Sequence, residues 1–188
     1  MPDHLSTVVN RVESISLGRA RTFHSRVDMV VPQSDGRPLV FQMTPKASLG
    51  TLTVQSADVR CKQKRAGYER WVNLSLCVPV EVREQLEGLE HRLRDLLRPR
   101  YQQIDNMWRS NVVPFVADMR LTGEHPCRVL NTSGAPIKPT DWTAVAVVPI
   151  VALRCLCIHQ AGVFADYEVV SILVAGQHDI APDAATFL

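Results

Sequence analysis

The sequence predicts a mainly β fold of the α+β class, a closed β-barrel with one amphipathic helix inserted between its strands. Most apolar residues alternate with polar ones at the period of a strand, and a single central segment repeats them at helical steps. Runs of strands around one main helix close most simply as a barrel or sandwich. We therefore expect one domain over residues 1–175 and a flexible, weakly acidic tail over 176–188.

The composition is that of a globular protein. The chain has 188 residues, of which 46% are hydrophobic, and a formal net charge of +2. A chain of this length buries a core of its own. Its net charge is too small to indicate a polyanionic partner, so any argument for nucleic-acid binding rests on local clusters of cations.

The cysteines and the start of the chain indicate an intracellular protein. Five cysteines, an odd number, do not match a secreted disulfide framework. The first residues lack the basic start and apolar run of a signal peptide, and no window approaches the roughly 20 apolar residues that span a bilayer. We expect a location in the nucleus, in the cytoplasm or at a viral replication site, and no membrane partner.

Four early segments read as strands. "VDMVV" and "LVFQM" flank the turn "PQSDGRP", with Asp35 and Gly36 at its centre. "TLTVQSADV" and "RWVNLSLCV" follow on either side of a basic loop. In the last of these, Val72 and Leu74 share one face, so Trp71 lies on the opposite, polar face.

A helix is expected over about residues 80–98. Its apolar residues recur at steps of three and four, namely Val82, Leu86, Leu89, Leu93 and Leu97. The opposite face carries nearly balanced acids and arginines, typical of a solvated, ion-paired surface. Pro99 ends the helix.

The last third of the chain returns to strands. "PFVADMRL" and "CRVLN" precede the long apolar run "WTAVAVVPIVALRCLCIHQ", which a tight turn at "QAG" joins to "VFADYEVVSILV". The long run is apolar on both faces, as in a strand covered on both sides. Pro149 within it indicates a bulge or bend.

The basic loop and its flanks combine cations with aromatic rings, as a groove for an unpaired nucleic-acid strand requires. We expect cations to hold phosphates and rings to stack on bases; the candidates are Arg60, Lys62, Lys64, Arg65, Tyr68, Arg70 and Trp71. The exit of the helix repeats this combination and could form a second wall, with Arg100, Tyr101, Trp108 and Arg109. The alternative is that the cations solubilise a loop while the tryptophans pack at core edges.

Metal binding and catalysis have weaker signals. Cys155, Cys157 and His159 share one strand face, which invites a zinc site completed by His125 or Cys127. Their spacing is not that of a Cys-x-x-Cys knuckle, and small buried thiols are the favoured alternative. The chain has no glycine-rich phosphate loop and no nucleophile elbow, so we expect neither an enzyme nor a cofactor.

Several segments, taken in order, resemble one family. "PLVFQMTPKASLG" follows a "PLxFQTPK" strand and turn ending in glycine, the strand "RWVNLSLCV" precedes a helix with Trp108 near its exit, and "GVFADYEVVSILV" matches a closing-hairpin pattern. The chain thus resembles the single-stranded-DNA-binding proteins of large nucleo-cytoplasmic DNA viruses, which are similar to a podophage replication protein with an OB fold. Met43 is an insertion in the first pattern, and Ala165 and Asp166 stand where the family keeps Phe-Gly.

The resemblance implies an OB-like barrel that binds single-stranded DNA, or RNA, without sequence preference in replication, recombination or repair. It also implies replication proteins as partners through the C-terminal tail, although this tail has only Asp179 and Asp183 as acids. The composition allows a monomer or a homodimer. It equally fits a structural or assembly protein, such as a virion component or scaffold, that binds no nucleic acid.

Overall fold

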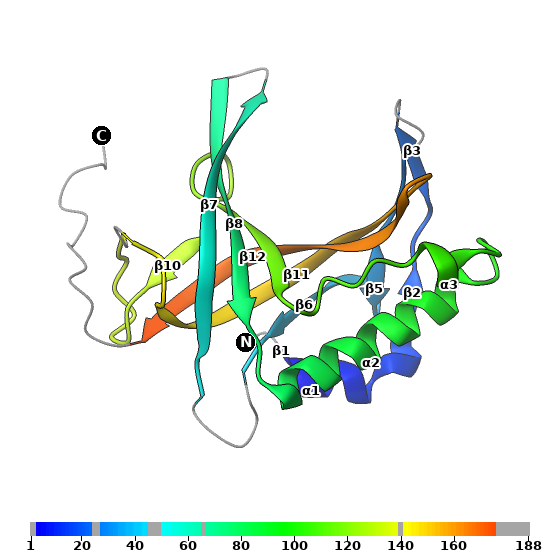
Figure 1. Ribbon diagram of the computed structural model, residues 1–188, viewed down its shortest axis with the longest axis horizontal. Coiled ribbons are helices and arrows are strands. Elements are labelled where there is room, and N and C mark those ends of the chain that lie inside the picture. The colour runs from blue at the N-terminus through cyan, green and yellow to red at the C-terminus, as the bar shows by residue number, and fades with distance from the viewer. Residues whose placement is uncertain (1–2, 24–26, 45–49, 65–66, 139–140, 176–188) are drawn as a thin grey trace.

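Strands make up most of the regular structure, as the sequence predicts (Figure 1). The computed structural model describes residues 3–23, 27–44, 50–64, 67–138 and 141–175. The expected tail over 176–188 and Arg65 lie outside these residues. None of the helices in the described part combines the length and the apolar character needed to cross a membrane.

Five strands pair in a closed circuit. They are β7 (Leu52–Lys64), β8 (Gly67–Cys77), β9 (Phe115–Arg120), β12 (Gly162–Ala175) and β11 (Ala146–His159), in their order around the sheet. β11 closes the circuit by pairing with β7. The β9–β12 pairing is parallel and the other four are antiparallel.

Shorter strands extend this sheet. They are β1 (Asp3–His4), β2 (Ile15–Leu17), β3 (Arg21–Phe23), β4 (Val27–Val30), β5 (Pro32–Ser34), β6 (Arg37–Gln42) and β10 (Arg128–Leu130). The turn predicted at Asp35 and Gly36 joins β5 to β6, with φ of 52° and 73° at these two residues. Positive φ at both central residues suits the twist of a hairpin, and Asp-Gly is a preferred pair there.

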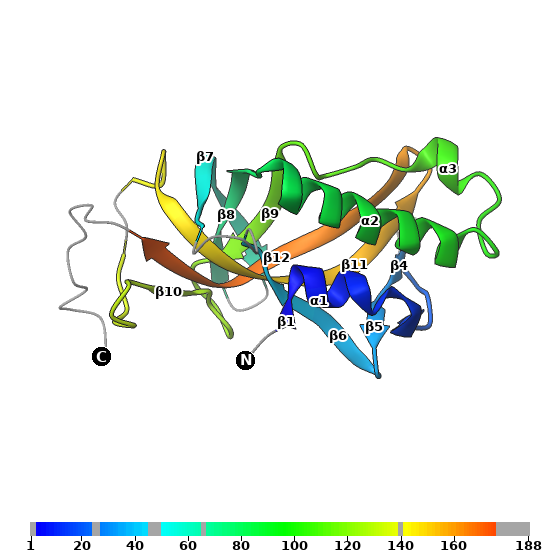
Figure 2. The ribbon, with the colours of Figure 1, turned by 90° about the horizontal axis from the view of Figure 1, so that it is seen from below.

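The helical layer covers one side of the sheet (Figure 2). It contains α1 (Leu5–Asn10), α2 (Val80–Leu97) and α3 (Ile104–Met107), with a 3-10 turn at Val12–Ser14 after α1. The helix expected over about 80–98 is α2, and its predicted apolar stripe is buried. Glu81 in its first turn and Arg94 in its last turn oppose the partial charges of the helix ends.

The core lies between α2 and the inner face of the circuit. Alternate residues of each strand point inward, among them Leu74 of β8, Met119 of β9 and Val169 of β12. Phe115 and Tyr167 meet there with ring centroids 4.9 Å apart. Residues between these positions lie on the opposite surface of β8, β9, β11 and β12, which we call the outer face.

The outer face is flanked by two hairpins. The long hairpin β7–β8 extends beyond the core on the side away from the helices, and β3–β4 rises on the same side at the other end of the sheet (Figure 1). On β11, the pairing register shifts after Ile150 and again between Leu153 and Cys155, near the bend expected at Pro149. The second shift leaves Arg154 unpaired in the ladder and puts Cys155 opposite Asp166.

Candidate nucleic-acid interface

Trp71 lies on the outer face, as its position in β8 predicts, but its ring is buried. Only 3% of the residue is exposed. Three cationic groups lie over the ring, with Lys62 Nζ at 4.1 Å, Arg120 Cζ at 4.6 Å and Arg154 Cζ at 5.4 Å from its centroid. Its indole Nε1 donates to Glu69 Oε2 at 3.2 Å. The ring expected to stack on a base is therefore already covered by the protein's own cations.

Carboxylates on the same face neutralise these cations. Lys62 Nζ lies 3.1 Å from Asp118 Oδ2, and Arg120 lies 3.5 Å from Glu168. Arg154 donates to both oxygens of Asp166, at 2.9 and 2.7 Å, and lies 3.4 Å from Glu168. We call Trp71 with these charged residues the charge cluster; its ions are Lys62, Arg120, Arg154, Asp118, Asp166 and Glu168.

The charge cluster has no net charge, because three cations face three carboxylates. Burial alone would lower the pKa of Arg154, but the hydrogen bond and negative charge of Asp166, with Glu168 and Asp118, raise that pKa above its usual value. Arg120, Arg154 and Asp118 are not among the site residues predicted from the sequence. For Asp118 and Arg120, alternation with the core residues Ala117 and Met119 of β9 was the available signal for the face that they occupy.

Other cations of this surface are exposed. Arg60 pairs with Trp71 in the β7–β8 register and so shares the outer face. Arg19 and Arg21 approach the same face from β3 and the residues before it. Within the described part of the chain, none of these three arginines has an ion-pair partner.

Tyr68 and Arg70 also lie on the long hairpin, but they point to the other side. Tyr68 pairs with Gln63 and Arg70 with Cys61, one residue out of phase with Trp71. Tyr68 is 72% exposed. The side chain of Lys64 lies outside the described part of the structure.

A cavity of about 840 Å³ adjoins the charge cluster. It is lined by Gly18, Arg19, Ala20, Arg21, Met29, Val31, Gln33, Arg154, Cys155 and Asp166. The cavity thus brings two exposed arginines, Arg19 and Arg21, near two residues of the charge cluster, Arg154 and Asp166.

The second wall expected after the helix does not form on this face. Trp108 belongs to the core, where its Nε1 donates to Glu90 Oε2 of α2 at 3.1 Å. Tyr101 is half-buried and donates to Asp28 Oδ2 at 3.1 Å, and burial together with this carboxylate raises its pKa. The chain leaves α2 within the helical layer, so these rings pack there.

The two arginines of that segment bind backbone carbonyls. Arg100 donates to Gly18 O at 3.2 Å, and Arg109 donates to Asn106 O at 3.5 Å and Trp108 O at 3.4 Å. Both side chains belong to exposed residues. Neither lines the cavity beside the charge cluster.

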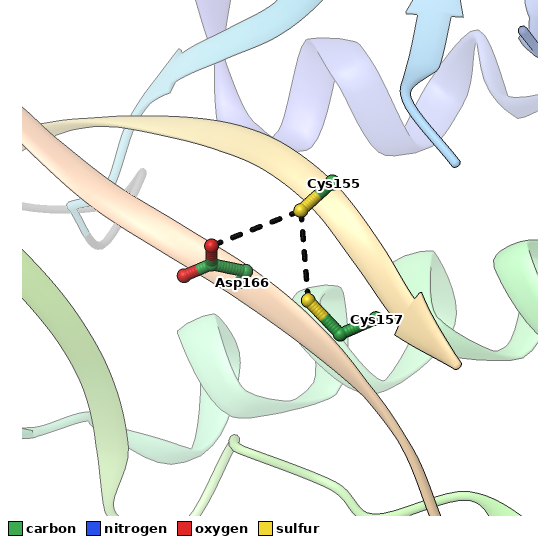
Figure 3. Close-up of side chains that lie close together, drawn as sticks. All are labelled: Cys155, Cys157 and Asp166. Atoms are coloured by element: carbon green, nitrogen blue, oxygen red, sulfur yellow. Dashed lines mark hydrogen bonds between the residues drawn. The ribbon is translucent and has the colours of Figure 1, made fainter. Parts of the chain in front are cut away.

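The two cysteines of β11 lie side by side on the outer face (Figure 3). Cys155 Sγ is 3.6 Å from Cys157 Sγ and 3.8 Å from Asp166 Oδ2. The hydrogen bond between the two thiols lowers the pKa of Cys157, and the same bond, with burial, raises that of Cys155. His159, expected to join them, instead accepts from Ala161 N at 3.3 Å and packs edge-on against Phe164.

A comparison with models of known protein families finds no match to this chain, and a comparison with curated proteins finds none either.

Proposed function

We propose that the chain binds single-stranded nucleic acid, DNA or RNA, without sequence preference along the outer face between the long hairpin and β3. The observation that carries the proposal is the separation of two groups of cations. Lys62, Arg120 and Arg154 are paired with carboxylates, whereas Arg19, Arg21 and Arg60 around them are exposed without an ion-pair partner in the described chain. Exposed, uncompensated arginines are the groups that bind phosphates.

The topology supports an OB-like interpretation. An OB barrel closes five strands in the order first, second, third, fifth, fourth and first again. Numbering β7, β8, β9, β11 and β12 from one to five gives this order, and the third and fifth strands are parallel. OB folds bind oligonucleotides on the face of their second and third strands and with the adjacent loops. Here that face carries Trp71 and Arg120, and the loop between the first two strands ends the long hairpin.

The position of the main helix in the strand order departs from the OB pattern. α2 follows the second strand of the circuit, β8, and precedes the third, β9. The helix nevertheless packs on the inner side of the circuit, opposite the outer face. The proposed binding face depends on the strand order and on the exposed surface, which this insertion does not alter.

Tyr68 is the stacking residue that we propose in place of Trp71. The residue is 72% exposed on the long hairpin, beside Arg70 on the same side. Stacking of a base on such a ring contributes about 1–3 kcal/mol and tolerates every base. A strand that crosses the outer face and turns over the hairpin edge would contact both Arg60 and Tyr68. Binding of this kind would serve replication, recombination or repair inside the cell.

The number of exposed, unpaired arginines on the described part of the outer face sets the expected salt dependence of binding. Each neutralised phosphate of a single strand contributes about −0.7 to the slope of log K against log salt concentration, so three exposed arginines give about −2. Use of the paired cations as well would double the number of contacts and give about −4. The slope thus reports whether the strand separates the ion pairs of the charge cluster.

The test is fluorescence anisotropy of a labelled oligo-dT strand at several salt concentrations. Arg21→Gln combined with Arg60→Gln is expected to weaken binding at least tenfold at low salt and to reduce the slope by about 1.4. The matched control combines Arg11→Gln with Arg83→Gln, which removes two cations from the helical side. Equal losses in both variants, or no binding by the wild type at low salt, would reject the proposal. A large, salt-resistant assembly that ignores oligonucleotides would support the structural alternative.

A further inference from the structure

Two thiols and a carboxylate converge on the outer face of β11 and β12. One ligand atom from each of Cys155, Cys157 and Asp166 lies within 4.8 Å of the other two (Figure 3). The register shift at Arg154 produces this arrangement, because it puts Cys155 opposite Asp166 while Cys157 follows on the same face. Thiolates and a carboxylate are a ligand set for a thiophilic divalent cation.

The distance between the sulfurs fits a tetrahedral ion. Two Zn–S bonds of about 2.3 Å at a tetrahedral angle separate their sulfurs by about 3.8 Å. The observed separation of Cys155 Sγ and Cys157 Sγ is 3.6 Å. An ion held linearly by bonds of the same length would separate them by roughly 4.6 Å. The pair therefore suits Zn²⁺ better than a linear two-thiolate ion.

A disulfide between the same cysteines fits less well. Residues two apart on an extended strand have Cα atoms about 6.4–6.8 Å apart, at the upper limit of the range in which disulfides form. The strand would have to bend for the two sulfurs to close from 3.6 Å to a bond of about 2.05 Å. A cation needs no such movement.

Charge and access also favour a cation. Two thiolates and the Asp166 carboxylate carry three negative charges, which a divalent cation and the Arg154 guanidinium would balance. Arg154 bonds both oxygens of Asp166, so one oxygen can remain with the arginine while the other binds a metal. Cys155 and Asp166 line the 840 Å³ cavity, which gives a route in and room for a fourth ligand.

We propose that Cys155, Cys157 and Asp166 form a site for a thiophilic divalent cation of the Zn²⁺ type, with a fourth coordination position open to the cavity. Binding to the two thiols and the ionised carboxylate releases two protons, one from each sulfur. Three protein ligands and an open position are the arrangement in which zinc acts on a bound water or ligand. The proposal is independent of nucleic-acid binding.

The test titrates Co²⁺ into the full-length, reduced, metal-free protein and records the absorption spectrum. We expect one equivalent to give a sulfur-to-cobalt charge-transfer band and the visible bands of a tetrahedral ion, and Zn²⁺ to remove both. Cys155→Ala with Cys157→Ala should abolish these bands. Asp166→Asn should weaken Zn²⁺ binding roughly 100-fold in competition with a chromophoric chelator. The control, Cys61→Ala with Cys77→Ala, removes two exposed thiols and should change neither result.

Two outcomes would overturn the proposal, and the first of them does not depend on the folding of a variant. One is a wild-type protein that gives no thiolate–cobalt band. The other is a band that survives in the Cys155→Ala, Cys157→Ala protein, which would assign the metal to other thiols. Circular dichroism of each variant shows whether loss of the band reflects loss of ligands. If the double variant unfolds, Asp166→Asn and the wild-type spectrum still decide the question.

Discussion

Lys62 binds Trp71 and Asp118 at the same time. Its ammonium nitrogen lies 4.1 Å from the centroid of the indole ring and 3.1 Å from the carboxylate oxygen Asp118 Oδ2. Lys62, on β7, thereby links the Trp71 ring on β8 to the Asp118 carboxylate on β9 across the outer face. The tryptophan is consequently a structural part of this surface, and in the function that we propose the ligand contacts its exposed neighbours instead.

Replacement of Trp71 tests this structural role. Trp71→Ala removes a buried ring and its three cationic contacts, so we expect the free energy of unfolding to fall by about 3–5 kcal/mol. Trp71→Phe keeps a ring beneath Lys62 and should cost less than half as much. Urea unfolding measures both changes.

The same variants separate packing from base stacking. If Trp71 supports the face without touching the ligand, the folded Phe variant should bind oligo-dT within about threefold of the wild type. Stacking on a base is worth about 1–3 kcal/mol, which corresponds to roughly 5- to 150-fold in affinity. An affinity loss of that size with little loss of stability would contradict the structural role.

Glu90 should stabilise the fold through two hydrogen bonds to its buried carboxylate. Its carboxylate, on a residue only 3% exposed, accepts from Trp108 Nε1 at 3.1 Å and from Asn111 N at 3.3 Å. Glu90→Gln replaces one acceptor oxygen by a donor that faces an N–H group. We expect the free energy of unfolding to fall by about 1–3 kcal/mol.

The control for this substitution lies on the same helix. Glu87 has a half-exposed side chain and a 3.8 Å ion pair with Arg83, so Glu87→Gln should change the free energy of unfolding by no more than about 0.5 kcal/mol. Thermal or urea unfolding of both variants at neutral pH gives the comparison. Equal effects would mean that the buried bonds to Glu90 contribute nothing specific.

Local patterns predict much of the fold because they depend on neighbours in the sequence. The turn at Asp35 and Gly36, the helix α2 and the faces of β8 all follow from spacing over a few residues. The closure of the circuit does not follow from such local spacing. Its parallel β9–β12 pairing joins Asp118 to Glu168, which lie fifty positions apart in the sequence. Periodicity assigns each residue to a face without naming its neighbours across the sheet.

The same limit explains which neighbours at the site the sequence could not show. The pattern puts Trp71 on the polar face, but it cannot show that Arg120 and Arg154 from other strands cover the ring. It groups Cys155 and Cys157 with His159, whereas the pairing of β11 with β12 brings Asp166 to them instead. In both places the decisive partner comes from a strand that is distant in sequence.

Tyr167 should make stability depend on alkaline pH. Its hydroxyl is buried and has no hydrogen-bond partner within the described residues, and burial, with the negative charge of Glu90, raises its pKa above the usual 10. Below pH 10 the hydroxyl is protonated in both states. As the pH rises above 10, the unfolded chain loses this proton first, so the free energy of unfolding falls.

Tyr167→Phe removes this dependence and the unpaired hydroxyl. We expect the variant to gain about 1 kcal/mol at neutral pH and to lose stability less steeply above pH 10 than the wild type does. Urea unfolding from about pH 8 to 11 measures both effects. Tyr68→Phe is the control, since it removes the hydroxyl of an exposed tyrosine instead of a buried one. Parallel profiles for wild type and Tyr167→Phe would contradict the prediction.

Gly88 is a site where stability can be gained. It lies within α2, and an added Cβ would meet only Val9 Cγ1 at 3.7 Å, an ordinary contact. Glycine in a helix interior costs about 0.5–1 kcal/mol relative to alanine, because its backbone loses more freedom on folding. Gly88→Ala should therefore raise the free energy of unfolding by that amount.

Gly162 is the matched contrast, because the same substitution should have the opposite sign there. Its φ is +154°, and an added Cβ would lie 3.0 Å from both Met107 O and Arg109 Cγ. Backbone strain and this contact with a carbonyl should lower the free energy of unfolding by about 1–3 kcal/mol in Gly162→Ala. Urea unfolding of the two variants in parallel measures the difference. If the Gly162→Ala protein is as stable as the wild type, the turn between β11 and β12 can move away from α3. That result would contradict the close packing of this turn against Met107 and Arg109.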